Sequence, residues 1–131
     1  MTTSGPVILV VDDEEGVRQV LRRILEEGGF TVIEADNGSS ALQVVRRSKG
    51  DISLVITDIT MPVMDGLELA RALQAINPGV PILFITGKDP ALLAQAGPNA
   101  RVLLKPFGPA LLLATVRRII GRADDGGSAD S

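Results

Sequence analysis

The sequence contains no cysteine and no histidine. Without cysteine the chain has no disulfide framework and no thiolate metal site, and this absence predicts a cytoplasmic location. Without histidine it lacks the commonest general base and metal ligand. Any catalysis must therefore use carboxylates, lysine and hydroxyl groups. Tryptophan and tyrosine are missing as well, so 3 phenylalanines are the only aromatic residues.

Strong net charge and long apolar runs are also absent. The formal net charge is −3, which argues against direct nucleic-acid binding, because nucleic-acid binders carry a basic face. No apolar run approaches the roughly 20 residues that a membrane span needs, and the first residues do not resemble a signal peptide. What remains is a chain of 131 residues, 45% hydrophobic and 22% charged. This composition is typical of one globular domain with an ordinary core.

The stretch from residue 52 to residue 66 organises the rest of the chain. Its apolar run is interrupted by Asp58 and followed by the turn-forming residues Pro62 and Asp65. A short apolar run bounded by turn signals predicts a strand buried on both faces, with Asp58 at its carboxyl end. Asp65 is expected to cap a helix that begins near Leu67. A lone Asp at such a place is more often a turn or capping residue, so its function depends on the other segments.

Four further strands and four further helices are predicted along the chain. The strands are Val7–Val11, Phe30–Ala35, Pro81–Ile85 and Val102–Leu104, of which Phe30–Ala35 alternates polar and apolar residues as an edge strand does. Apolar residues at helical spacing predict helices from the acidic run 12–15 to Gly28, from Ser39 or Ser40 to Gly50, over 91–96, and from Pro109 to Gly121. Residues 1–5 and 122–131 are expected to be disordered ends of a domain that covers residues 6–121.

Strands that alternate with helices predict an α/β fold, a doubly wound parallel sheet covered by helices on both faces. Of the two common strand orders, 2-1-3-4-5 is the one that needs only five strands, and its switch point lies between the first and third strands. Asp12 and Asp13 follow the first strand, and Asp58 ends the third. The three carboxylates are therefore expected to converge at one edge of the sheet.

Converging carboxylates repel one another, which raises their pKa values or demands a cation. Oxygen ligands without histidine or cysteine favour Mg²⁺, which prefers a few carboxylates together with water and phosphate oxygens. Thr86 ends the fourth predicted strand and Lys105 follows the fifth. Each residue alone has a plain interpretation, since Thr86 suits a turn and most lysines are solvated. Together they predict an anion site beside the carboxylates.

Four segments carry a resemblance to a known family. They are Val-Asp-Asp-Glu at 11–14, Thr-Asp-Ile-Thr-Met-Pro-Val-Met-Asp-Gly at 57–66, Thr-Gly at 86–87 and Lys-Pro-Phe at 105–107. On these segments the chain resembles a response-regulator receiver domain over residues 6–121. The resemblance implies a flavodoxin-like (βα)5 fold and a place in two-component or phosphorelay signalling.

The resemblance also implies a role for each site residue. Asp58 is then the phosphoacceptor, and Thr86 and Lys105 hold phosphoryl oxygens. Mg²⁺ is bound by Asp58, by Asp13 directly, by Asp12 through water and by the backbone carbonyl of Thr60. A cis peptide bond is expected between Lys105 and Pro106.

The resemblance implies partners and activity as well. The phosphoryl group comes from a histidine kinase or a histidine phosphotransfer protein, and the downstream target is a protein. The chain is not an enzyme in the usual sense but catalyses its own phosphorylation and dephosphorylation, as a monomer or weak dimer. The arginine pairs Arg22–Arg23, Arg46–Arg47 and Arg117–Arg118 are most simply solvated helix faces. Because the first helix is the usual kinase-docking surface of the family, the resemblance gives Arg22 and Arg23 a claim to partner contact as well.

Two departures from the family pattern bear on signalling. The family usually has Tyr or Phe where this chain has Val102, and the spacing from Thr86 to Lys105 is about one helical turn shorter than usual. The expected output is therefore a change in two loops, residues 59–65 and 87–90, rather than rotation of an aromatic side chain.

Three functions stay open at this point. The first is a stand-alone receiver, and the second is a receiver fragment of a hybrid kinase or a longer regulator. The third is a phosphohydrolase with an aspartyl nucleophile, as in haloacid-dehalogenase-like enzymes. Those enzymes need a second Asp two residues after the nucleophile, where this chain has Thr60.

Overall fold

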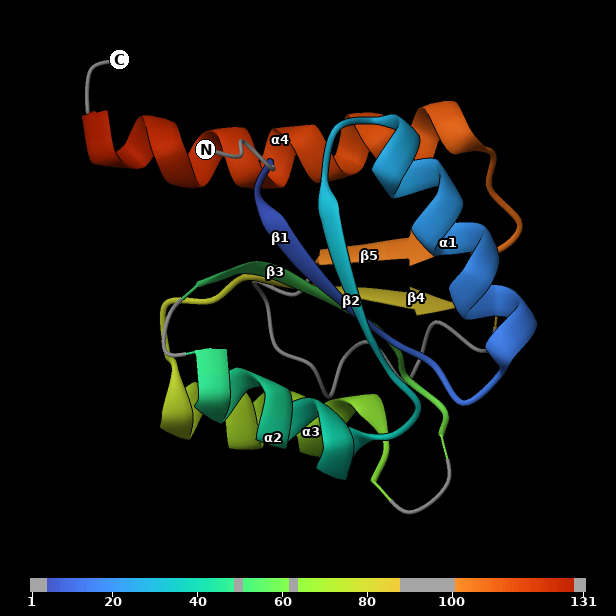
Figure 1. Ribbon diagram of the computed structural model, residues 1–131, viewed down its shortest axis with the longest axis vertical. Helices are drawn as coiled ribbons and strands as arrows, with labels where there is room; N and C mark the ends of the chain where they lie inside the picture. Colours follow the sequence, from blue (N-terminus) through green and yellow to red (C-terminus); the bar gives the residue numbers. More distant parts are fainter. Residues whose placement is uncertain (1–4, 49–50, 62–63, 88–100, 129–131) are drawn as a thin grey trace.

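The computed structural model describes the backbone of residues 5–48, 51–61, 64–87 and 101–128, with side chains as far as residue 121. Five parallel strands form one sheet in the order β2-β1-β3-β4-β5 (Figure 1). The strands are β1 (Val7–Val11), β2 (Thr31–Ala35), β3 (Ile52–Asp58), β4 (Ile82–Thr86) and β5 (Arg101–Leu104). This order confirms the predicted fold, including the place of β2 at an edge.

Helices cover both faces of the sheet (Figure 1). They are α1 (Glu15–Glu27), α2 (Gly38–Ser48), α3 (Gly66–Ile76) and α4 (Pro109–Ser128). Helices α1 and α4 pack on one face, and α2 and α3 pack on the other. The helix predicted over 91–96 and residues 88–90 of the predicted signalling loop lie outside the described residues.

Strand β1 shows why the central strands are apolar throughout. Ile8 and Val10 point into the cluster beneath α1 and α4, whereas Leu9 and Val11 point into the cluster beneath α2 and α3. Because successive side chains of a strand alternate between faces, a strand covered on both sides needs apolar residues at every position. All four residues are essentially buried.

The boundaries of two helices follow from polar caps. At α3 the side chain of Asp65 accepts the backbone N–H of Glu68, and the Glu68 side chain accepts the N–H of Asp65, which confirms the predicted cap. At α2 neither serine starts the helix. The side chain of Asn37 instead accepts the N–H of Ser40 at 2.8 Å, so the helix begins earlier, at Gly38.

The predicted end of the last helix at Gly121 is wrong, because α4 continues to Ser128. A single glycine inside a helix costs about 1 kcal/mol relative to alanine. That cost does not end a helix whose preceding turns are fixed by the buried side chains of Leu112, Val116 and Ile120. Of the tail predicted to be disordered, the part up to residue 128 is therefore helical, and residues 129–131 lie outside the described residues.

Candidate functional site

The predicted site residues lie at the carboxyl edge of the sheet. Asp12 follows β1, Asp58 is the last residue of β3, Thr86 is the last residue of β4, and Lys105 follows β5. Since all the strands are parallel, their carboxyl ends share one edge. The structure therefore brings together residues that are far apart in the chain.

Asp58 has a distinct partner at each carboxylate oxygen. Oδ2 lies 3.3 Å from the ammonium nitrogen of Lys105, and Oδ1 accepts the backbone N–H of Thr60 at 3.0 Å. The Asp58 side chain is 14% exposed and that of Lys105 is 33% exposed. An anionic oxygen pair thus faces a positive charge and remains partly open to solvent.

Thr86 lies deeper than the carboxylates. The residue is completely buried, and its backbone carbonyl accepts the N–H of Lys105 at 2.9 Å. The ends of β4 and β5 are therefore joined at the level of the site. The peptide bond between Lys105 and Pro106 is cis, as the resemblance implied.

Asp12 is buried at 2% exposure, while Asp13 is exposed. Burial raises the pKa of the Asp12 carboxyl above its ordinary value, and the negative charges of Asp58 and Asp13 raise it further. A hydrogen bond from the Glu14 N–H, at 2.9 Å, and the charge of Lys105 act in the opposite direction. Neighbouring negative charge therefore acts on Asp12 in the direction that the sequence predicted, although burial is the larger cause.

The residues present fit a magnesium ion. Within the part of the chain that the structure describes, no three acidic side chains are already grouped as a metal site. Mg²⁺ does not need such a cage, because it usually binds one or two carboxylates and keeps several waters. The pKa of Asp12 is raised chiefly by burial and in smaller part by the negative charges of Asp58 and Asp13, and a bound cation would stabilise the ionised form. The ligand atoms on offer are all oxygens.

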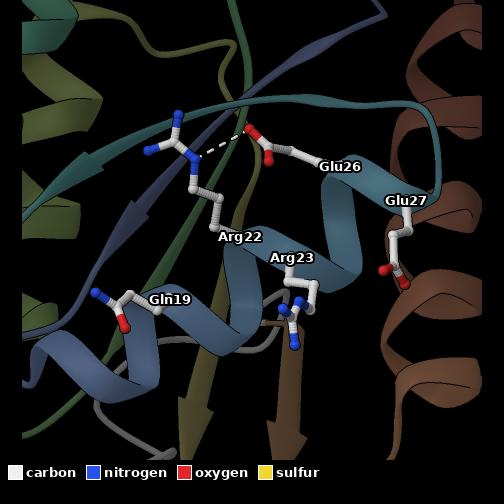
Figure 2. A pocket seen from close by; sticks show the side chains of 5 residues that line it. All are labelled: Gln19, Arg22, Arg23, Glu26 and Glu27. Carbon is white, nitrogen blue, oxygen red and sulfur yellow. Dashed lines mark hydrogen bonds and ion pairs between the residues drawn. The ribbon is translucent and has the colours of Figure 1, made fainter.

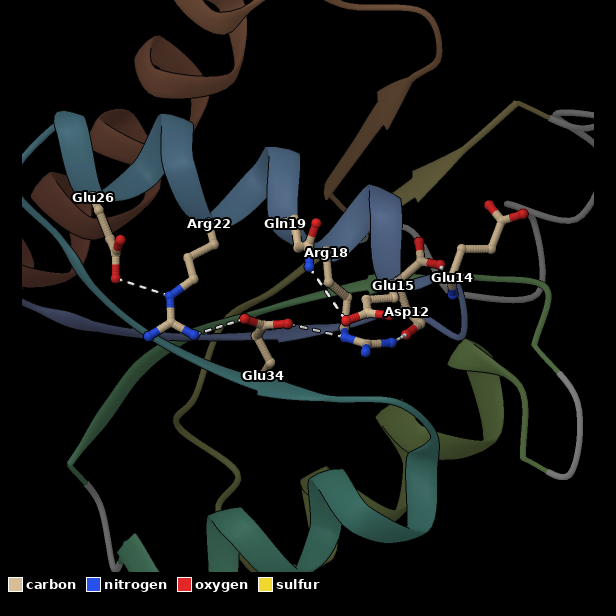
Figure 3. A network of polar contacts seen from close by, with 8 residues as sticks. All are labelled: Asp12, Glu14, Glu15, Arg18, Gln19, Arg22, Glu26 and Glu34. Carbon is tan, nitrogen blue, oxygen red and sulfur yellow. Dashed lines mark hydrogen bonds and ion pairs between the residues drawn. The ribbon is translucent and has the colours of Figure 1, made fainter.

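A polar network beside the site was not predicted from the sequence (Figure 3). Glu34 of β2 accepts hydrogen bonds from Arg18 and Arg22 of α1, and Arg18 also donates to the backbone carbonyl of Asp12. The sequence carries one signal for it: Glu34 interrupts an apolar strand. From the sequence alone, that acid indicates only an edge strand.

The network changes the interpretation of the first arginine pair. Arg22 binds the carboxylates of Glu26 at 3.0 Å and Glu34 at 2.6 Å, so its guanidinium is held within the chain. Figure 2 shows Arg22 directed to Glu26 on one side of α1 and Arg23 directed to the other side. Partner contact of this pair stays a prediction.

An apolar groove of about 670 Å³ lies next to the site. Its walls are the α1 side chains Val17, Val20 and Ile24 and the segment from Lys105 to Phe107. Val20 is 58% exposed. Among the described helices, none is both long and apolar enough to cross a membrane.

Comparison with known proteins agrees with this geometry. The family model described as "Response regulator receiver domain" matches residues 8–117. The receiver protein CpdR of Brucella abortus is 43% identical over 76% of this chain and 84% of its own length. Response regulator MprA of Mycobacterium leprae is 38% identical over 95% of this chain, but the chain spans only about half of that relative, 55%. The Vibrio cholerae chemotaxis protein CheY4 superposes with a TM-score of 0.80 at 31% identity, covering 88% of this chain and 98% of its own.

The chain belongs to the response regulator receiver domain family. Its flavodoxin-like sheet matches solved receiver structures. Membership is consistent with two-component signalling and sets aside the phosphohydrolase alternative, for which Thr60 stands where a second Asp is needed.

Proposed function

We propose that the chain accepts a phosphoryl group on Asp58 and changes its affinity for a protein partner when it does so. The observation that supports this most directly is the Asp58 carboxylate at the end of the central strand, partly exposed and 3.3 Å from the Lys105 ammonium. A carboxylate next to a positive charge is suited to attack a phosphoryl group whose oxygens that charge can then stabilise.

The residues have separate tasks in this proposal. An oxygen of Asp58 forms the new bond to phosphorus, and the bond from phosphorus to the donor breaks, with its electron pair leaving on the donor. Lys105 moves from the carboxylate to a phosphoryl oxygen, and the Thr60 N–H holds the orientation of Asp58. Thr86 provides a hydroxyl to another phosphoryl oxygen after a rearrangement that brings it out of the core. Water later attacks the phosphorus and restores the carboxylate.

Mg²⁺ would be held by Asp12, Asp13, Asp58 and the backbone carbonyl of Thr60. When bound, it neutralises charge on the carboxylates and on the transferred group. Asp12 is the carboxylate that would be stabilised most by the ion, since its pKa is raised by burial and by neighbouring negative charge.

The phosphoryl donor is a histidine kinase or a histidine phosphotransfer protein. The apolar groove between α1 and the Lys105–Phe107 segment borders the site, and an amphipathic partner helix docked there would bring its phosphorylated histidine to Asp58. The relatives of this chain include both a short receiver and a longer regulator, and the proposed downstream target is a protein. The predicted cytoplasmic location stays a prediction.

The acceptor is tested by labelling with acetyl phosphate in the presence of Mg²⁺. We expect Asp58→Asn to abolish labelling, because the amide replaces the nucleophilic oxygen. Asp65→Asn is the matched control, since it makes the same change in the same loop and asparagine still caps α3. Equal labelling of the Asp58→Asn variant and the wild type would show that another residue is the acceptor.

A further inference from the structure

Arg18 links the helix α1 to the peptide that carries the acidic pair. Its Nη1 donates to the backbone carbonyl of Asp12 at 2.7 Å, and its Nε donates to Oε1 of Glu34 at 3.0 Å (Figure 3). The side chain is only 14% exposed. A guanidinium presents several donors in a rigid plane, so two bonds in different directions fix its orientation.

The carbonyl of Asp12 belongs to the same rigid plane as the backbone nitrogen of Asp13, because the peptide bond is planar. A hydrogen bond to that carbonyl therefore sets the rotation of the plane from which the Asp13 side chain departs. The other polar groups of Asp12 are held as well: its N–H donates to Ala35 and its carboxylate accepts from Glu14. Arg18 is the side chain that holds the link between the two acids.

Glu34 anchors Arg18 in this position. Its two carboxylate oxygens accept from Arg18 and Arg22 separately, and its side chain is 22% exposed. Arg22 stands one turn further along α1 and binds the same carboxylate and that of Glu26, whereas the hydrogen bond to the Asp12 carbonyl comes from Arg18. The chain thus offers two arginines with the same charge and the same anchor, of which one reaches the acidic pair.

We propose that Arg18 is a positioning residue for the magnesium ligands. It orients the peptide between Asp12 and Asp13 so that both carboxylates are placed to bind one cation. Arg18 itself contacts neither the cation nor the phosphoryl group. The inference rests on the proposed function and adds to it a residue outside the motifs of the sequence.

The sign of the effect separates positioning from simple electrostatics. Arg18→Gln removes a positive charge near the cation site, and Coulomb attraction alone would make Mg²⁺ bind more tightly. Loss of positioning makes Mg²⁺ bind more weakly, by about tenfold, as is typical when an outer partner of a metal ligand is removed. Arg22→Gln removes the same charge and the same type of bond to Glu34, so its Mg²⁺ affinity should equal that of the wild type or rise slightly.

The experiment measures Mg²⁺ affinity by titration calorimetry for the wild type, Arg18→Gln, Arg18→Lys, Arg22→Gln and, as the reference for loss of a ligand, Asp13→Ala. We expect the Mg²⁺ affinity of Arg18→Lys to lie between those of the wild type and Arg18→Gln. The lysine ammonium keeps the charge but cannot make both hydrogen bonds of the guanidinium. Thermal unfolding of each variant shows that it is folded, and Arg18→Lys serves if Arg18→Gln is not. The second readout is the NMR amide signal of Asp13 in metal-free protein, which should shift and become more mobile in both Arg18 variants but not in Arg22→Gln.

The outcomes distinguish this inference from the proposed function. A wild type that binds Mg²⁺, with both glutamine variants equal to it, would overturn the role of Arg18 and leave the proposed function intact. A wild type that neither binds Mg²⁺ nor accepts a phosphoryl group would contradict the proposed function. In that case the mobility of the Asp13 amide still decides whether Arg18 positions the peptide, and an unchanged amide in both Arg18 variants rejects it.

Discussion

Asp12 directly follows β1, and Glu34 lies on the neighbouring strand β2. Their pKa values are shifted in opposite directions. The pKa of Glu34 is lowered, chiefly by the hydrogen bond from Arg22 and then by that from Arg18. The pKa of Asp12 is raised, chiefly by burial. An acid with a lowered pKa stabilises the folded state at neutral pH, whereas an acid with a raised pKa destabilises it there.

These opposite signs predict opposite pH dependences. Glu34→Gln should lower the free energy of unfolding at pH 7 by about 1 kcal/mol, because bonds from two arginines to a charged group are weakened. The deficit should be constant at neutral pH and shrink as the pH falls below 4.5, the ordinary pKa of Glu34, through its lowered value in the folded protein. Urea unfolding at a series of pH values measures this.

Asp12→Asn in metal-free buffer is the control for that prediction. Ionised Asp12 opposes folding, and protonation relieves the cost between its raised pKa and its ordinary value of 3.8. The wild type should therefore gain stability relative to Asp12→Asn as the pH falls through this window. A Glu34→Gln deficit that does not change with pH would show that the lost contacts are not those of an ionised carboxylate.

At the level of elements, the connection between β3 and α3 is built around a close approach of two backbones. The N–H of Gly66 donates to the carbonyl of Ile59 at 2.8 Å. A Cβ at position 66 would collide with the carbonyl oxygen of Asp58 and would lie 2.9 Å from the Cα of Ile59. The first residue of α3 thus packs directly against the end of the strand that carries the proposed acceptor.

Gly66→Ala should therefore disturb both stability and chemistry. We expect the free energy of unfolding to fall by about 1–3 kcal/mol, the usual cost of forcing extra atoms into a packed site. Labelling of Asp58 by acetyl phosphate should slow, because the end of β3 must shift. The measurements are urea unfolding and the rate of labelling.

Gly121→Ala is the matched control within α4. A Cβ there meets no atom within 4 Å, and alanine in a helix is favoured over glycine by about 0.5–1 kcal/mol. The variant should be more stable than the wild type, which would also support continuation of α4 beyond residue 121. Equal stability of Gly66→Ala and the wild type would contradict the close approach at the end of β3.

At the scale of the whole molecule, the loop after Asp58 reaches a second helix. The side chain of Met64 packs against Gly38, the first residue of α2, so closely that a Cβ at Gly38 would lie 2.6 Å from the sulfur. At the opposite edge, Val102 is partly buried against the cluster beneath α2 and α3. An aliphatic side chain in such a contact cannot form a hydrogen bond by rotating.

We therefore expect phosphorylation to change residues 59–66 and the start of α2 and to leave β5 nearly unchanged. Amide exchange with and without beryllofluoride and Mg²⁺ measures this, with Asp58→Asn under the same conditions as the control. The amide exchange of Thr60, whose N–H donates to Asp58, should be among those that change. Large protection changes across 101–104 and α4, with none at 59–66, would contradict this route.

Much of the fold, and the place of several polar residues at one edge of the sheet, followed from local pattern. Doubly buried strands need uninterrupted apolar residues, so Val7–Val11 and the run before Asp58 could be read from the sequence alone. Parallel strands place their carboxyl ends at one edge, so Asp12, Asp58 and Lys105 could be expected to meet. These are consequences of chain direction and hydrophobic periodicity.

The rest depended on contacts between distant segments. In the sequence, Glu34 is only a polar residue in an edge strand. In the structure, α1 lies over it and brings Arg18 and Arg22 within hydrogen-bonding distance. Gly121 is a helix terminator by composition, but the buried side chains of the preceding turns carry α4 past it. Periodicity determines which way a side chain faces. The packing of helices on the sheet determines which partner that side chain contacts, because burial and charge pairing there outweigh local preference.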